Sequence, residues 1–161
     1  MYRKDREITD IAAKIAVIDR CKVCRLGLAE DNRPYIVPVN YGYRYVSGVL
    51  TVYIHGAARG KKWEIIKKNN AACFEVDGAH QLIEADNACN YAFAYESVIG
   101  FGHIAVIDAD AKEEKVEALN VIMKHQTGKE VAHHFSDAAL DAVAVYMLPI
   151  DDWTGKQRKM V

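Results

Sequence analysis

Two adjacent lysines stand where a strand-like run passes into a predicted helix. The segment reads Tyr53-Ile54-His55-Gly56-Ala57-Ala58-Arg59-Gly60-Lys61-Lys62-Trp63, with small residues between the strand and the helix start. Free backbone N–H groups and the positive end of the helix dipole favour a phosphate there, and the lysines would add positive charge. The same lysines are also typical of a solvated helix start. The spacing therefore leaves two interpretations open, an anion site or an ordinary exposed helix end.

Cysteine is the second residue type whose spacing suggests chemistry. The four cysteines are Cys21, Cys24, Cys73 and Cys89, and the first two form a C-x-x-C pair. Residues 22–29 alternate like a strand, in which residues three apart point to opposite faces, so these two thiols are not expected to converge. We expect inert thiols in a reducing compartment and no metal site, with a zinc site that recruits Cys73 or a histidine as the alternative.

Three later histidines do not change that expectation. His125, His133 and His134 lie in predicted helix or loop positions without a carboxylate or cysteine at ligand spacing. A metal site built on them is therefore not predicted.

Length and charge limit the classes of protein to consider. The chain has 161 residues and a formal net charge of −1, with 21 Lys and Arg against 22 Asp and Glu. One domain over residues 1–161 is expected, because the chain shows no repeat, low-complexity tract or linker. The charge balance gives no global attraction for nucleic acid or an anionic membrane, and no apolar run is long enough to span a bilayer. We expect a soluble, cytoplasmic protein with neither nucleic acid nor membrane as a partner.

Hydrophobic periodicity predicts helices and strands that do not strictly alternate. A first helix capped by Thr9 or Asp10 is followed by a hairpin of residues 22–29 and 34–43, a strand over 49–55, a helix over 59–68 and a strand over 71–77. Residues 78–90 read as polar and irregular. A strand over 97–108, a helix over 111–124 with Asp110 as candidate cap and a stop at Thr127-Gly128, a short helix over 137–140 and a strand over 143–149 complete the chain.

This order favours a mainly β fold with helices, in the α+β class. Neighbouring antiparallel strands with a few helices predict a small curled β-barrel rather than a doubly wound parallel sheet. The chain has neither a G-x-G-x-x-G between a strand and a helix nor a Walker loop, so the common nucleotide fingerprints are absent.

Several ordered blocks together carry a more specific resemblance. They are Pro34-Tyr35-Ile36-Val37-Pro38-Val39-Asn40-Tyr41-Gly42-Tyr43, Val52-Tyr53-Ile54-His55-Gly56-Ala57, Gly60-Lys61-Lys62, Tyr95-Glu96-Ser97-Val98-Ile99-Gly100-Phe101-Gly102 and Thr154-Gly155-Lys156-Gln157. In this order the chain resembles the nitroimidazole-resistance branch of the pyridoxamine-phosphate-oxidase-like flavoproteins. The resemblance implies an FMN-binding split β-barrel of antiparallel strands that works as a homodimer with FMN at the interface.

The resemblance also implies which residues serve the cofactor. Residues 38–41 would lie along the flavin ring, Lys61 and Lys62 would hold the phosphate with help from Arg59, and Ser97 with the following N–H groups would close over the phosphate or ribityl chain. Trp153 and Tyr91 would cover the flavin or form interface core. The implied cofactor-binding residues are Pro38, Val39, Asn40, Tyr41, His55, Gly56, Arg59, Lys61, Lys62, Ser97, Val98 and Trp153.

His55 is the residue to which the resemblance assigns the chemistry. An imidazole beside the flavin would donate a proton to a reduced nitro group or anchor a small carboxylate. The implied function is an FMN-dependent oxidoreductase that passes electrons to a small, nitroaromatic acceptor. A non-catalytic flavin- or haem-binding module for storage or sensing is the alternative, and a deazaflavin is a further possible cofactor.

The sequence departs from the oxidase that gives the wider family its name. The basic residue and terminal lysine that the oxidase uses around its flavin are replaced here by residues 34–41, and an arginine-histidine pair for pyridoxal phosphate is absent near residue 161. Oxidation of pyridoxamine phosphate is therefore not expected.

Overall fold

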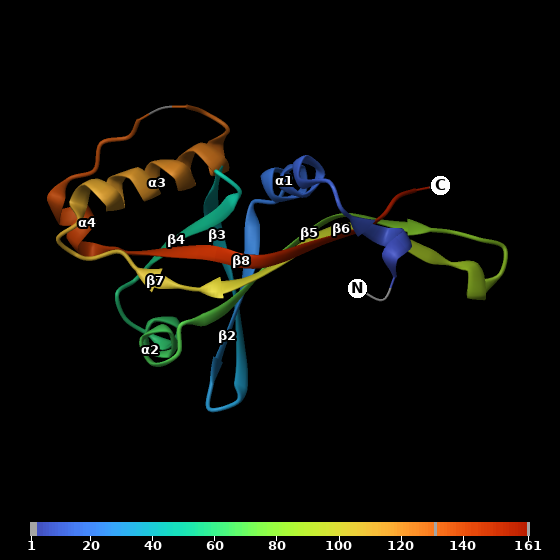
Figure 1. Ribbon diagram of the computed structural model, residues 1–161, viewed down its shortest axis with the longest axis horizontal. Helices are drawn as coiled ribbons and strands as arrows, with labels where there is room; N and C mark the ends of the chain where they lie inside the picture. The colour runs from blue at the N-terminus through green and yellow to red at the C-terminus, as the bar shows by residue number, and fades with distance from the viewer. Residues whose placement is uncertain (1–2, 131, 161) are drawn as a thin grey trace.

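Antiparallel strands make up most of the computed structural model, which describes residues 3–130 and 132–160 (Figure 1). Along the chain the elements are a 3-10 helix at Lys4–Arg6, β1 at Glu7–Ile8, α1 at Ile11–Arg20, β2 at Val23–Glu30, β3 at Arg33–Val46, β4 at Val49–Gly56, α2 at Lys61–Lys68, β5 at Ala71–Ile83, a 3-10 helix at Ala88–Asn90, β6 at Ala92–His103, β7 at Ala105–Val106, α3 at Lys112–Thr127, α4 at Asp137–Ala142 and β8 at Ala144–Arg158.

The strands close on themselves. Their order is β1-β8-β4-β3-β2-β5-β6, and β6 also pairs with β8, so β8, β4, β3, β2, β5 and β6 form a ring. Every recorded pairing is antiparallel. The curled antiparallel barrel and the α+β class predicted from the sequence are confirmed.

Alternation along the strands builds the core inside this ring. On β2, Cys24, Leu26 and Leu28 are buried, whereas the residues between them face outward. Tyr41 and Phe74 lie fully buried in the same interior with ring centroids 5.2 Å apart. Burial of this apolar surface is the main force that holds the barrel closed.

The turns follow from residues that tolerate left-handed backbone. Asp31 and Asn32, between β2 and β3, have φ of 50° and 62°, which suits a two-residue hairpin turn. Ser47 and Gly48 do the same between β3 and β4, with φ of 51° and 85°. The predicted hairpin is therefore present, and a second hairpin joins β3 to the expected strand β4.

The helices pack on different parts of the barrel (Figure 1). Asp10 caps α1 by accepting a hydrogen bond from the Ala13 N–H at 2.9 Å, and α2 packs near β2. α3 lies across β3 and β4, and its backbone meets β3 at Gly42, where an added Cβ would lie 2.6 Å from Val121 O and from two backbone atoms of Ile122. Glycine at this position lets α3 approach the strand closely.

Several predicted boundaries were wrong. Residues 78–83, expected to be irregular, continue β5 past a bulge, and β6 begins at Ala92 and ends at His103, with β7 separate from it. β8 continues to Arg158 rather than ending at residue 149. Asp110 is not the cap of α3, because the N-cap is Ala111 and no side chain caps it. The expected stop is present, since Gly128 ends α3 with φ of 69°.

Candidate functional site

Asn40 and His55 lie on adjoining strands, on the outer face of the barrel. The β3–β4 register ends with Tyr41 opposite Ile54, and both of these side chains are fully buried. Because side chains alternate along a strand, Asn40, just before Tyr41, and His55, just after Ile54, point outward. Asn40 is fixed in place because its amide donates to Gln126 Oε1 at 3.2 Å. Gln126 in turn donates to the Tyr41 carbonyl at 2.8 Å, which ties the end of α3 to β3.

His55 opens onto an apolar cavity of about 240 Å³. Among the described residues that line it, His55 is the only polar side chain, and the others are Leu119, Ile122, Met123, Phe135, Ala139 and Val143. An apolar cavity of about 150 Å³ accommodates benzene. The cavity beside His55 therefore has room for a substituted aromatic ring.

The electrostatic surroundings of His55 favour its neutral form. Burial lowers the pKa of the imidazole, and the positive charge of Lys62 lowers it further. A histidine with a lowered pKa is mostly neutral near neutral pH, and once protonated it gives up its proton more readily.

The start of α2 presents unpaired backbone donors next to this histidine. Gly60 is the N-cap with φ of 96° and no side chain caps the helix, so the first N–H groups have no partner within the helix. Lys61, however, forms an ion pair with Glu30, which also binds Lys68 at 3.0 Å. An anion at this helix start would compete with Glu30 for Lys61.

Lys62 has a different environment from Lys61. Its ammonium nitrogen lies 4.9 Å from the centroid of the Tyr146 ring, and a Cβ on Gly56 would approach it to 2.8 Å. Burial lowers the pKa of Lys62, and within the described ranges no carboxylate forms an ion pair with it. Lys62 is therefore the cation that stands free beside His55 and Gly56.

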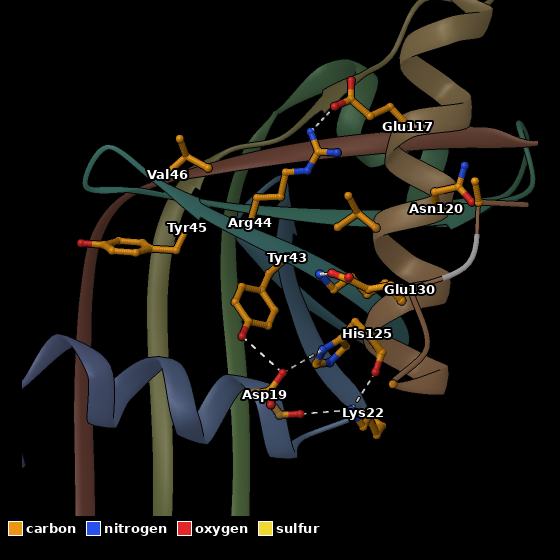
Figure 2. A pocket seen from close by; sticks show the side chains of 14 residues that line it. Asp19, Lys22, Tyr43, Arg44, Tyr45, Val46, Glu117, Asn120, His125 and Glu130 are labelled. Carbon is orange, nitrogen blue, oxygen red and sulfur yellow. Dashed lines mark hydrogen bonds and ion pairs between the residues drawn. The ribbon is translucent and has the colours of Figure 1, made fainter.

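A larger cavity of about 910 Å³ lies between the end of α1, the second half of β3 and α3 (Figure 2). Two ion pairs stand in its lining, Arg44 with Glu117 and Lys124 with Glu130. Its other lining residues are Asp19, Lys22, Tyr43, Tyr45, Val46, Asn120, Val121, His125, Gly128 and Ala132.

His125 is a buried base in this second cavity, with a side chain only 3% exposed. Its ring lies 4.6 Å from that of Tyr41 and 5.4 Å from that of Tyr43, measured between centroids. Nε2 lies 2.8 Å from the carbonyl oxygen of Cys21. A carbonyl oxygen only accepts hydrogen bonds, so Nε2 carries the proton. Nδ1 is buried without a hydrogen-bond partner, and Asp19 Oδ1 is 3.9 Å away.

Sequence reasoning considered His125 only as a metal ligand and missed this role. The available signal was its position in the apolar stripe of α3. Ala118, Val121, Ile122 and His125 follow at helical spacing, and all four are buried. A histidine at a core position of an amphipathic helix was the sign that its ring would be buried.

Comparison with known proteins decides the family. The family model described as pyridoxamine 5'-phosphate oxidase matches residues 10–157. The chain belongs to this family. A search of curated proteins finds no significant match.

Solved structures extend the comparison. The chain is 30% identical to a candidate 5-nitroimidazole antibiotic resistance protein from Bacteroides thetaiotaomicron, with a TM-score of 0.78 over 94% of this chain and 86% of that one. It is 23% identical to the FAD and haem binding protein from Mycobacterium smegmatis, with a TM-score of 0.78 over 96% and 74% of the two chains. It is 22% identical to a flavocytochrome from Azotobacter vinelandii, with a TM-score of 0.74 over 96% of this chain and 70% of that one. These structures share the split-barrel fold of this pyridoxamine 5'-phosphate oxidase family member.

In this family member, some residues that the resemblance assigned to the cofactor have buried side chains. Tyr41 is fully buried, and its hydroxyl donates to the Ile18 carbonyl at 2.6 Å, so only its backbone can serve a ligand. Val98 is fully buried too, and Val39 packs against the core. Pro38 faces outward opposite Arg25.

A second group of assigned residues lies apart from His55. Ser97 on β6 pairs with Asp77 and Lys156. Trp153 on β8 packs near Tyr45, with ring centroids 6.0 Å apart. Asn40 lies on β3, His55 and Gly56 end β4, and Lys61 and Lys62 begin α2 after a short loop that carries the exposed Arg59. Ser97 and Val98 lie instead on β6, and Trp153 lies on β8.

The cysteines remain unpaired in this family member. Cys21, Cys24, Cys73 and Cys89 are all free, and burial raises the pKa of Cys24 to about 12. Across residues 3–130 and 132–160, His, Cys, Asp and Glu side chains nowhere gather in threes that could hold a metal ion. Over the same residues, the helices are all too short or too polar to cross a membrane.

Proposed function

We propose that this protein binds FMN and passes electrons from it to a small acceptor, with a nitroaromatic compound as the acceptor class and His55 as the proton donor. The observation that carries the proposal is the position of His55. Among the described residues it is the single polar group that lines an apolar, ring-sized cavity, and the charge of Lys62, at the open start of α2, is near enough to lower its pKa.

The residues around α2 fit the phosphate of FMN. The uncapped N–H groups of the first turn, the unpaired Lys62 and the exposed Arg59 supply donors and positive charge, and Lys61 can exchange Glu30 for a phosphate. We assign Pro38 and Asn40, which are exposed on β3, to the flavin ring. FMN would supply the electron transfer, so that the chain needs only to bind and orient it and to deliver a proton.

A second copy of the chain would complete the site. Ser97 and Trp153 lie on β6 and β8, away from His55, and would reach a flavin only from another protomer. Ile36 and Phe101 are 67% and 54% exposed on the outer face, which supports burial of that face in a homodimer. We therefore propose a homodimer with FMN at its interface.

The relatives support a flavin and a nitro acceptor. The Bacteroides thetaiotaomicron protein, 30% identical, is described as a candidate for 5-nitroimidazole resistance, and the Mycobacterium smegmatis protein by its FAD and haem. Because residues 34–41 lack the basic positions of the pyridoxamine phosphate oxidase, we do not assign that reaction here. The free cysteines favour the cytoplasm as the compartment.

An absorption spectrum followed by FMN titration tests the cofactor. We expect flavin bands, and we expect Lys62→Ala to weaken FMN binding by about tenfold or more, because a charge-assisted contact contributes about 1.5–3 kcal/mol. Lys67→Ala is the matched control, since Lys67 lies on the same helix over Trp63. A Soret band in place of flavin bands would instead make His55 a candidate haem ligand. A colourless protein that ignores FMN would refute the proposal.

A further inference from the structure

We propose that the cavity between α1, β3 and α3 binds a small organic ammonium ion, whose N–H groups fill the gap between His125 Nδ1 and Asp19 Oδ1. The site, drawn in Figure 2, is lined by Asn120, Lys124 and other residues of one face of α3, whereas Leu119 and Met123 on the opposite face line the His55 cavity, so the site does not depend on the flavin.

Two acceptors face each other across this gap. Nε2 of His125 holds the ring proton against the Cys21 carbonyl, so the neutral ring presents a lone pair at Nδ1. Asp19 Oδ1, 3.9 Å away, is also an acceptor and receives the Tyr43 hydroxyl, whereas among the described residues no donor reaches Nδ1. A buried polar atom without a hydrogen-bond partner destabilises the folded protein. A ligand with several N–H donors would give Nδ1 a partner and at the same time form a charge-assisted hydrogen bond to the Asp19 carboxylate.

The remaining charges of the cavity select the sign of the ligand. Arg44 and Lys124 already have carboxylate partners. Lys22 donates to two backbone carbonyls, those of Asp19 at 3.1 Å and His125 at 2.7 Å. Within the described part of the chain, the carboxylate of Asp19 accepts a hydrogen bond only from the Tyr43 hydroxyl, at 3.3 Å. The carboxylate of Asp19 is therefore the charge best placed to receive a ligand, and a carboxylate calls for a cation.

The walls fit an organic cation better than a bare ion. Tyr43 and Tyr45 present aromatic rings on the same side of the cavity, and aromatic faces attract ammonium groups. The cavity of about 910 Å³ also leaves ample room for a carbon body. Asp19 is 66% exposed at its side chain, so it can turn to admit a donor between itself and His125.

Three probes with one body and different head groups test the ligand class. They are 2-phenylethylamine, 2-phenylethanol and 3-phenylpropionate, titrated into the purified protein while the ¹⁵N signals of the His125 ring are followed. We expect the amine to bind at least about tenfold tighter than the other two, because charge-assisted hydrogen bonds are the strong ones. It should also shift the Nδ1 signal in the direction of an accepted hydrogen bond.

Two variants that each remove one negative charge from the lining locate the site. Asp19→Asn should weaken binding of 2-phenylethylamine by about tenfold or more, whereas Glu130→Gln should change it by less than about twofold, because Glu130 is exposed at the rim. The proposal is overturned if the alcohol or the propionate binds as well as the amine, or if both variants act alike. It is also overturned if the Nδ1 signal does not move, which would leave a bound water as the partner of His125.

Discussion

The two cavities on either side of α3 hold histidines in opposite settings. His55 is a polar side chain at the wall of an apolar cavity, with Lys62 as the charge that affects it. His125 is buried between tyrosines on the floor of a polar cavity, with one nitrogen bonded and the other without a partner. Burial lowers the pKa of both rings. The comparison shows that a lowered pKa does not identify a role, and that the partners of each nitrogen do.

Removal of the His55 imidazole should have the largest effect, because it tests whether this histidine donates the proton. His55→Gln should lower kcat for reduction of nitrobenzene by about a hundredfold or more at saturating FMN, since a general acid typically contributes about 10²–10⁴. His103→Gln should leave kcat unchanged, because His103 is exposed on β6 and pairs only with Asp151. Equal kcat in the His55 variant and the wild type would remove His55 from the chemistry.

The contact that separates the two cavities can be broken at one position. In Gly42→Ala, a Cβ would meet backbone atoms of Val121 and Ile122 at 2.6 Å, so α3 must shift. We expect a loss of about 1–3 kcal/mol in the free energy of unfolding, measured by urea denaturation, and weaker binding at both sites. Gly27→Ala is the control, since its nearest contact is a side-chain carbon of Cys73 at 3.3 Å. A fully stable Gly42→Ala protein would contradict this packing.

A single filled cavity should affect only one of the two sites. Ala139→Leu adds bulk to the lining beside His55 and should raise KM for nitrobenzene by about tenfold, the scale of a methylene misfit in an apolar pocket. Ala138→Leu, one residue earlier on α4 and outside the lining, should leave KM for nitrobenzene unchanged. Binding of 2-phenylethylamine should stay the same in both variants. A raised KM in both would show that the cavity does not hold the acceptor.

The pH dependence of stability should distinguish the two histidines. The pKa of His125 is lowered in the folded protein, so as pH falls the unfolded chain takes up the proton first, near pH 6.5. Stability should therefore fall as pH drops below that value and level off below the folded pKa. His125→Gln should flatten this slope in denaturation measured from pH 8 to pH 5, and His55→Gln should flatten it less because His55 is more exposed. If both variants kept the wild-type dependence of stability on pH, groups other than these two histidines would be responsible for it.

The parts of the fold that bury one face could be predicted from sequence. β2, β3 and β4 alternate because one side faces the core, and their turns use Asp, Asn, Ser and Gly. The missed part of β5, residues 78–83, runs in a hairpin that extends beyond the barrel (Figure 1), where its side chains are mostly exposed. Without a buried face that strand carries no alternation to detect.

The site divides in the same way. The strand-to-helix segment at His55 and Lys62 is local and was found from sequence, whereas the cavity beside it joins α3, Phe135 and α4, which follow more than sixty residues later. His125 depends on the Cys21 carbonyl and on Asp19, about a hundred residues away. Backbone acceptors and distant packing leave no pattern in a single sequence.

The rate of nitrobenzene reduction against pH tests the central claim most directly. If His55 delivers the proton, the wild-type rate should rise as pH falls toward its lowered pKa, below 6.5, and level off beneath it. His55→Gln should show no such rise. The same rise in the variant and in the wild type would contradict the role of His55 and leave the cavity beside it as a binding surface only.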